Sequence, residues 1–165
     1  MNATDGRIEG YRLQEAPLHL LRLSLQRMTD LFQRRAPAGL TLRQFVLLLA
    51  AHQRPGSTQT DLVALTGIDR STVGDMLDRL VKREFIRRKR SGEDQRANAI
   101  HVLPAGVAAL ASAMPAAIAA QEEFLAPIPP DQRSSFLGLL HRLAGAGMVT
   151  PPVAEQPAED DRATG

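Results

Sequence analysis

Cysteine and tryptophan are absent from this 165-residue sequence, and aromatic residues make up only 4% of it. Without cysteine, the chain can form neither a disulfide nor a redox-sensing thiolate. The scarcity of aromatic side chains argues against a surface that stacks single-stranded bases. No apolar run of about 18 residues is evident, and no charged-then-apolar segment opens the chain. We therefore expect a soluble cytoplasmic protein that has no membrane partner.

The sequence also lacks the common signatures of catalysis. It contains no His-Glu-x-x-His, no Gly-rich phosphate loop with Lys, and no nucleophile elbow. The four histidines (His19, His52, His101 and His141) fall in separate predicted elements. We interpret the last three as structural or surface residues, so we expect neither an enzyme nor a bound metal or other cofactor.

Charge is unevenly distributed along the chain, although the formal net charge is only +2. Residues 79–96 contain eight Lys/Arg and three Asp/Glu, a net of +5, whereas residues 149–165 contain four acids and one Arg, a net of −3. This pattern predicts a basic surface for a polyanion and a disordered acidic tail over 149–165. We expect residues 1–10 to be flexible as well.

The outer parts of the chain predict helices with more apolar surface than one domain needs. A helix is expected from Pro17 to about Arg35, with two apolar stripes, which requires two partners. A second, alanine-rich helix is expected from Pro104, kinked or broken at Pro115, and a last one from Pro129. We predict that residues 11–35 and 105–147 form the dimerisation helices of a homodimer. The stripes of the first helix are Leu18, Leu21, Leu25, Met28 and Phe32, and Leu20, Leu23 and Leu31.

The middle of the chain has the pattern of a helix-turn-helix followed by a hairpin. Thr41 is expected to cap one helix, a short helix spans Gln59 to Thr66, and Gly67 ends it. Asp69 then caps a helix that runs to about Arg83, before strands over 85–90 and 97–103. The predicted fold class is therefore mostly α with a small β-hairpin wing. It is a winged helix-turn-helix over about 41–103, inside a single domain of residues 11–148.

The second helix of this motif has a polar face suited to a DNA groove. Small residues near its start allow it to enter a major groove about 12 Å wide. Ser71 and Thr72 can reach bases or phosphates, and Asp75 can accept a hydrogen bond from a cytosine amino group. The alternative is an ordinary surface helix with Asp75–Arg79 and Asp78–Lys82 pairs. The inward face is expected to consist of Val73, Met76, Leu77 and Leu80.

Four consecutive cations, Arg87 to Arg90, lead into the hairpin turn. The four positive charges repel one another, so a polyanion partner explains the run better than a solvated edge strand does. The alternative is that the charges keep an edge strand from pairing with another chain. We expect Arg88 and Arg90 to attract DNA phosphates.

These features together resemble the MarR family of bacterial transcription regulators. The residues that carry the resemblance are Gly67 to Val73, Leu77 to Arg83, and Glu93 to Arg96, and it extends from about Pro17 to Leu143. It implies an obligate homodimer on an inverted-repeat operator in double-stranded DNA. The absence of cysteine excludes the thiol-oxidation branch of the family.

The resemblance also assigns roles in the wing. Arg96 is expected to enter the minor groove, whose negative potential favours a cation, and Asp94 to orient it. One departure is that Pro104 replaces the Thr that often caps the following helix in this family. The candidate DNA-binding residues are Arg70, Ser71, Thr72, Asp75, Arg79, Arg88, Arg90, Asp94 and Arg96.

The resemblance further implies an effector, a small aromatic carboxylate or phenol bound between the dimerisation helices and the winged domain. Residues 10–22 are similar to the opening of MarR members that control aromatic-acid catabolism. On the first helix, Arg22 can hold a carboxylate by two hydrogen bonds, and His19 can bond a second oxygen. These two residues belong to a polar row at helical spacing, and the alternative is that this row is a solvated face. The row consists of Arg12, Glu15, His19, Arg22 and Gln26. We expect a repressor released by an aromatic acid; the alternative is a constitutive DNA-binding protein without an effector.

Overall fold

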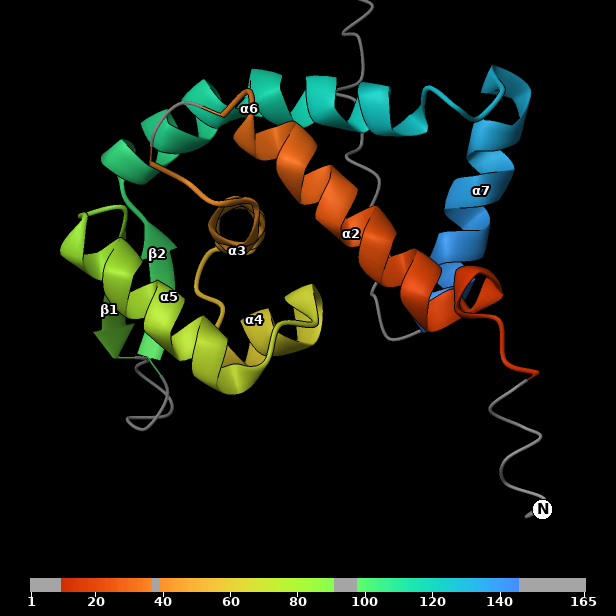
Figure 1. Cartoon of the computed structure of the whole chain (residues 1–165). Coiled ribbons are helices and arrows are strands. Elements are labelled where there is room, and N and C mark those ends of the chain that lie inside the picture. Colours follow the sequence, from red (N-terminus) through yellow and green to blue (C-terminus); the bar gives the residue numbers. More distant parts are fainter. Residues whose placement is uncertain (1–9, 37–38, 91–97, 146–165) are drawn as a thin grey trace, which may run out of the picture.

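The computed structural model describes residues 10–36, 39–90 and 98–145. It is mostly helical with one antiparallel hairpin, which confirms the predicted fold class (Figure 1). The elements in chain order are η1 (Leu13–Glu15), α2 (Pro17–Gln33), α3 (Leu42–Gln53), α4 (Gln59–Thr66), α5 (Arg70–Lys82), β1 (Ile86–Arg90), β2 (Asn98–Val102), α6 (Pro104–Leu125) and α7 (Pro130–Leu143).

Capping side chains fix the starts of the helices that lead into the winged motif. Thr41 and Gln44 form a reciprocal capping box at the start of α3, and Thr58 and Asp61 form another at α4. Hydrogen bonds from the backbone and hydroxyl groups of Thr58 lower the pKa of Asp61. Gly67 ends α4 in the left-handed conformation. These boundaries agree with the predicted ones because caps are set by residues close in sequence.

The core of the winged motif surrounds α3, which is seen end-on in Figure 1. The predicted inward face of α5 is confirmed, since Val73, Met76, Leu77 and Leu80 are all buried. The hairpin adds Ile86 from β1 and Ile100 from β2, and the strands pair with Arg88 opposite Ile100. The buried and exposed faces of α5 could therefore be predicted from the helical spacing of its apolar residues.

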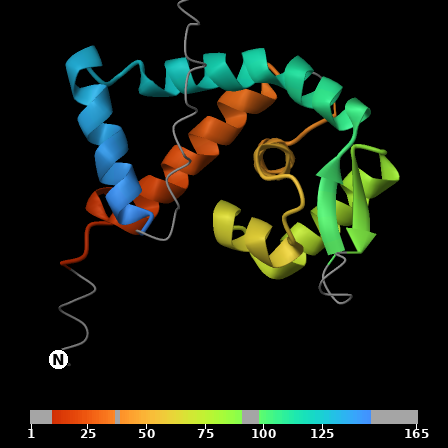
Figure 2. The ribbon, with the colours of Figure 1, turned by 180° about the vertical axis from the view of Figure 1, so that it is seen from behind.

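Of the kink or break predicted at Pro115, the break is wrong, because helix α6 continues unbroken through this residue. The ribbon curves along its length in Figures 1 and 2, as helices that contain proline do. Pro115 itself is exposed, while Ala113, Ala116 and Ala117 around it are buried. The missing hydrogen bond therefore falls on the solvent side, and packing of the alanine face holds the helix together.

By length and composition α6 is also apolar enough to cross a membrane, so the expectation of no such run is wrong. A third of its most apolar window (33%) is buried inside the chain, against α2 and α3. The other two thirds of this window are not buried in the described chain.

Two helices have apolar side chains that the described chain leaves uncovered. Helix α2 buries only Leu31 and Phe32, near its C-terminal end, and α7 buries no residue. In Figures 1 and 2, α7 turns away from the end of α6 and stands apart from the winged motif. The exposed large apolar residues on these two helices are Leu18, Leu20, Leu21, Leu23, Leu25, Leu137, Leu139 and Leu143.

Candidate nucleic-acid interface

Hydrogen bonds near the starts of α4 and α5 hold these two helices against each other. The amide of Gln59 donates to the backbone oxygen of Arg70 at 3.0 Å, and the Arg70 guanidinium donates to the Thr60 hydroxyl at 3.1 Å. A Cβ on Gly74 would lie 3.2 Å from the Gln59 amide nitrogen, so this position has little spare room. Arg70, a predicted DNA contact, thus also helps to set how α5 is presented.

Asp69 organises the first turn of α5. Its carboxylate accepts hydrogen bonds from the Thr72 backbone at 2.8 Å and from the Ser71 hydroxyl at 2.7 Å. The hydrogen bonds from Thr72, and then that from Ser71, lower the pKa of Asp69 to about 2, so it stays charged. Because the Ser71 hydroxyl donates its proton to Asp69, its oxygen is left to accept a hydrogen bond from a donor in the groove.

The other predicted groove residues lie on the accessible side of α5. Ser71, Asp75 and Arg79 are exposed at helical spacing, and Thr72 is half-buried beside them. This face is polar and uncovered, as an element that enters a major groove must be. The base and phosphate contacts of these residues stay predictions.

The ion pairing on this face differs from the alternative weighed from the sequence. Asp78 pairs with Arg88 of β1 at 2.8 Å, and no Asp78–Lys82 or Asp75–Arg79 pair is present among the described residues. Arg88 is therefore held against α5 by this ion pair, and 35% of its side chain is exposed. Sequence patterning did not identify Asp78 as this partner, because the pair forms only once β1 packs beside α5.

The basic strand carries its charge outward. Ile86 is buried, whereas Arg87, Arg88 and Lys89 are exposed, and α5 packs beside β1. A positive ridge therefore lies next to the outer face of the recognition helix. Arg90 ends β1, but its side chain lies outside the described residues, as do Asp94 and Arg96 of the predicted wing tip.

Comparison with known proteins agrees with this geometry. The sequence profile of the MarR family matches residues 40–97. The transcriptional repressor NicR of Pseudomonas putida is 31% identical over 134 residues, which cover 81% of this chain and 85% of NicR. The chain belongs to the MarR family. It is a DNA-binding transcription regulator of that type, and its relatives are regulators rather than enzymes.

Two solved structures extend the MarR comparison to the whole fold. BpsR of Bordetella bronchiseptica, whose DNA binding is regulated by 6-hydroxynicotinic acid, has a TM-score of 0.75 and 28% identity, covering 82% of this chain and 98% of that one. The repressor CouR bound to a 23-mer DNA duplex has a TM-score of 0.72 and 30% identity, covering 80% and 94%.

The residues predicted to bind an effector in this MarR chain lie on the first long helix. In the described chain His19 is half-buried and Arg22 is exposed. Gln26, in the same polar row, donates to Asp30 at 2.9 Å, and Arg12 lies 3.9 Å from Glu15. No part of the described chain encloses Arg22, and its role as a ligand residue stays a prediction.

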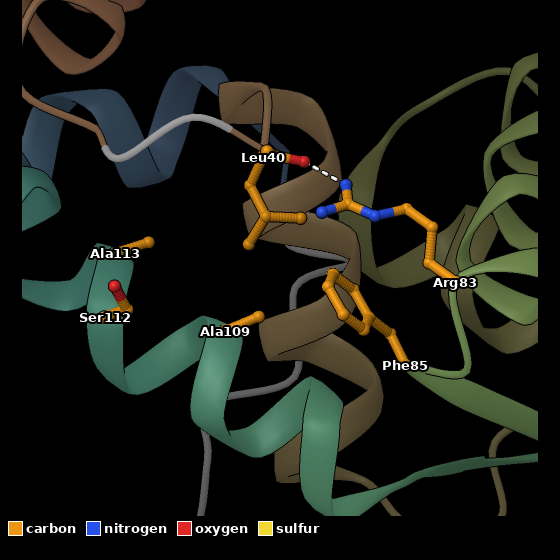
Figure 3. A pocket seen from close by; sticks show the side chains of 7 residues that line it. Leu40, Arg83, Phe85, Ala109, Ser112 and Ala113 are labelled. Atoms are coloured by element: carbon orange, nitrogen blue, oxygen red, sulfur yellow. Dashed lines mark hydrogen bonds between the residues drawn. The ribbon is translucent and has the colours of Figure 1, made fainter.

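A cavity that sequence reasoning did not find lies between the winged motif and α6 (Figure 3). Its volume is about 140 Å³, and neither His19 nor Arg22 lines it. The Arg83 guanidinium donates to the backbone oxygen of Gly39 and lies 4.3 Å above the centre of the Phe85 ring. The lining residues are Gly39, Leu40, Arg83, Phe85, Ala109, Ser112 and Ala113.

Proposed function

We propose that this MarR-family chain is a homodimeric repressor that occupies an inverted-repeat operator and leaves it when a small aromatic acid binds. The observation that carries the proposal is the exposed polar face of α5 beside the basic strand β1. Two relatives support it. NicR is a transcriptional repressor, and CouR has been solved on duplex DNA.

The uncovered apolar faces of α2 and α7 support a second copy as the dimer partner. Leu18 is 67% exposed, Leu25 57% and Leu143 74%, on helix faces that the described chain leaves uncovered. Burying a leucine side chain contributes about 1.5–3 kcal/mol, so covering this set strongly favours association. The interface is expected within residues 11–35 and 105–147, and a two-fold dimer matches a two-fold operator.

On the operator, each α5 is expected to lie in a major groove and each wing against the neighbouring minor groove. Ser71 and Asp75 face base edges, and Arg88 and Arg90 attract phosphates. Arg96 enters the minor groove, and Asp94 orients it. The remaining contacts in this assignment are Arg70, Thr72 and Arg79.

The effector is proposed from the relatives and from the polar row on α2. BpsR responds to 6-hydroxynicotinic acid, which is a small aromatic acid. In the dimer, Arg22 would hold such a carboxylate through two hydrogen bonds and His19 would bond a second oxygen. The ligand would favour a dimer whose two recognition helices no longer match successive major grooves. In the alternative, the protein binds DNA constitutively and no acid changes its operator affinity.

Operator binding is tested by footprinting the region upstream of the gene and titrating the protected duplex. Arg96→Ala is expected to cripple binding without altering the thermal melt, and Asp94→Ala to weaken it by freeing the arginine. Arg43→Ala, on the exposed side of α3, is the matched control. Parent-like binding by Arg96→Ala or Asp94→Ala contradicts the wing assignment, and a monomeric mass in light scattering at micromolar concentration contradicts the dimer.

The effector residues are tested by calorimetric titration of benzoate-, salicylate- and nicotinate-like acids. Arg22→Ala is expected to lose most of the affinity that the parent shows. Because linkage is reciprocal, the factor by which an acid weakens DNA binding must equal the factor by which DNA weakens acid binding. Equal acid affinity in parent and Arg22→Ala removes Arg22 from the site.

A further inference from the structure

We propose that the acidic C-terminal segment of this chain, residues 149–165, binds the basic outer face of the hairpin and competes with DNA for it. The segment lies outside the described residues, and its sequence holds four acids and one Arg, a net charge of −3. The acids are Glu155, Glu159, Asp160 and Asp161. The contact itself does not depend on the proposed repressor function, because a DNA duplex of any sequence can serve as the competitor.

The outer face of the hairpin is the one that carries Arg87 and Lys89. Side chains alternate between the two faces of a strand. Ile86 is buried and Arg88 pairs with Asp78 of α5, so both lie on the inner face. Arg87 and Lys89 therefore point away from α5, and both are exposed. Figure 2 shows this side of the molecule, with the two strands in front of α5.

No acid in the described part of the chain neutralises these two cations. The residues opposite Arg87 and Lys89 on β2 are His101 and Ala99, neither of which is acidic. No described carboxylate lies within 4.0 Å of either cation, whereas Arg88 on the inner face has one. The outer face therefore presents positive charge that suits an anionic partner.

The acidic segment matches this face in charge and in spacing. Residues two positions apart on a strand lie about 6.6 Å apart on one face, as Arg87 and Lys89 do. In an extended segment, Glu159 and Asp161 have the same spacing, so two carboxylates can meet two cations. Exposed ion pairs each contribute about 0–1 kcal/mol, so the contact is weak enough for DNA to displace.

The chain that follows α7 is long enough to reach the hairpin. Helix α6 starts soon after β2 and is about 33 Å long, and α7 is about 21 Å long. Because α7 turns back from the end of α6 in Figures 1 and 2, the distance from its end to the hairpin is shorter than the two lengths combined. Residues 146–161 span up to about 53 Å when extended.

Tethering makes even a weak contact matter for DNA binding. A segment on a short flexible linker acts at a local concentration in the millimolar range, so a contact with a Kd of about 1 mM is formed about half of the time. DNA must displace the segment to reach the same cations, which lowers its affinity about twofold, and further for a tighter contact. The competition is expected to fade as salt screens the ion pairs.

The first test titrates the full-length protein with a duplex of about 20 base pairs of arbitrary sequence at several salt concentrations. Glu159→Gln with Asp161→Asn is expected to bind about two- to fivefold more tightly than the parent at about 50 mM salt, with a smaller gain at about 200 mM. Glu122→Gln with Asp131→Asn is the matched control. It changes the same residue types and the same net charge at exposed positions on α6 and α7, and is expected to bind like the parent.

The second test detects the contact without DNA. Because the sequence contains no cysteine, Ala163→Cys gives a single site for a spin label beside the acids. The label is expected to broaden the amide signals of Arg87 and Lys89 more than that of Arg43, an exposed cation at the start of α3. Adding the duplex, or introducing Glu159→Gln with Asp161→Asn, is expected to restore these signals.

The outcomes separate this inference from the proposed function. Selective broadening at Arg87 and Lys89, with a gain in affinity in the segment variant but not in the control variant, supports the competition. Equal affinities in the two variants, or no selective broadening, overturns it even if operator binding is normal. If both tests succeed in a protein that protects no operator, the contact is kept and the repressor is rejected.

Discussion

Gly106→Ala offers a sharp test of how α6 is anchored to the winged motif. Gly106 lies in the first turn of α6 and is buried against the end of the α5–β1 turn. A Cβ at this position would lie 2.2 Å from the Phe85 oxygen and 2.9 Å from a Val102 methyl carbon. A carbon normally approaches a carbonyl oxygen to about 3.3 Å, so the backbone must separate by about 1 Å.

The cost of that shift can be worked from its parts. Overpacking of this kind costs about 1–3 kcal/mol. Moving the Phe85 oxygen also weakens its hydrogen bond from the Leu103 backbone, now 2.8 Å long, which contributes about 1 kcal/mol. Alanine recovers about 0.5–1 kcal/mol through its better helix propensity. We expect Gly106→Ala to lower the free energy of unfolding by about 1–3.5 kcal/mol, with a central value of about 2 kcal/mol.

Urea denaturation at fixed protein concentration measures this loss as a midpoint lowered by about 1 M with an unchanged slope. Gly138→Ala is the matched control, because it makes the same substitution inside α7, where no described atom lies within 4 Å of the new Cβ. This control is expected to be neutral or stabilising by up to about 1 kcal/mol. If Gly106→Ala is as stable as the control, the close approach of α6 to Phe85 is wrong.

Three further predictions concern α5 and its ends. The pKa of Asp69 is lowered to about 2, so the charged carboxylate stabilises the fold fully above about pH 4, and this stabilisation is lost as the pH falls toward 2. Asp69→Asn should therefore flatten the dependence of Tm on pH between these values. Asp78→Asn releases Arg88, so affinity for every DNA sequence should rise and the salt slope should steepen by about one unit in titrations at several salt concentrations. Glu84 has a φ of +57°, so Glu84→Gly should raise the free energy of unfolding by about 0.5–1 kcal/mol in urea, and Glu84→Val should lower it.

Features governed by neighbours in the sequence were the ones that could be predicted. The bounds of α4, the cap at Asp69 and the buried face of α5 all depend on residues within a few positions of each other. Hydrogen-bonded caps and helical periodicity act over one or two turns, so the residue pattern is sufficient to place them. The fold class followed from the order of these elements.

Contacts between distant segments could not be predicted in this way. Arg83 and Gly39 are 44 positions apart, and Arg35, just after α2, pairs with Glu123 of α6, which is 88 positions away. Their meeting depends on how complete elements pack. The same reason explains the missed partner of Arg88 and the intact helix at Pro115, where tertiary packing outweighs a local preference.

The turn between α5 and β1 lies against the start of α6 and connects it to the winged motif. Phe85 accepts a hydrogen bond from the start of α6 through its backbone oxygen, and its ring supports Arg83 at the end of α5. Gly106 lets α6 lie directly against the same residue. Phe85 therefore contacts the end of α5 and the start of α6 at the same time. Displacing Phe85 would therefore disturb α5, β1 and α6 together, because packed elements move as units.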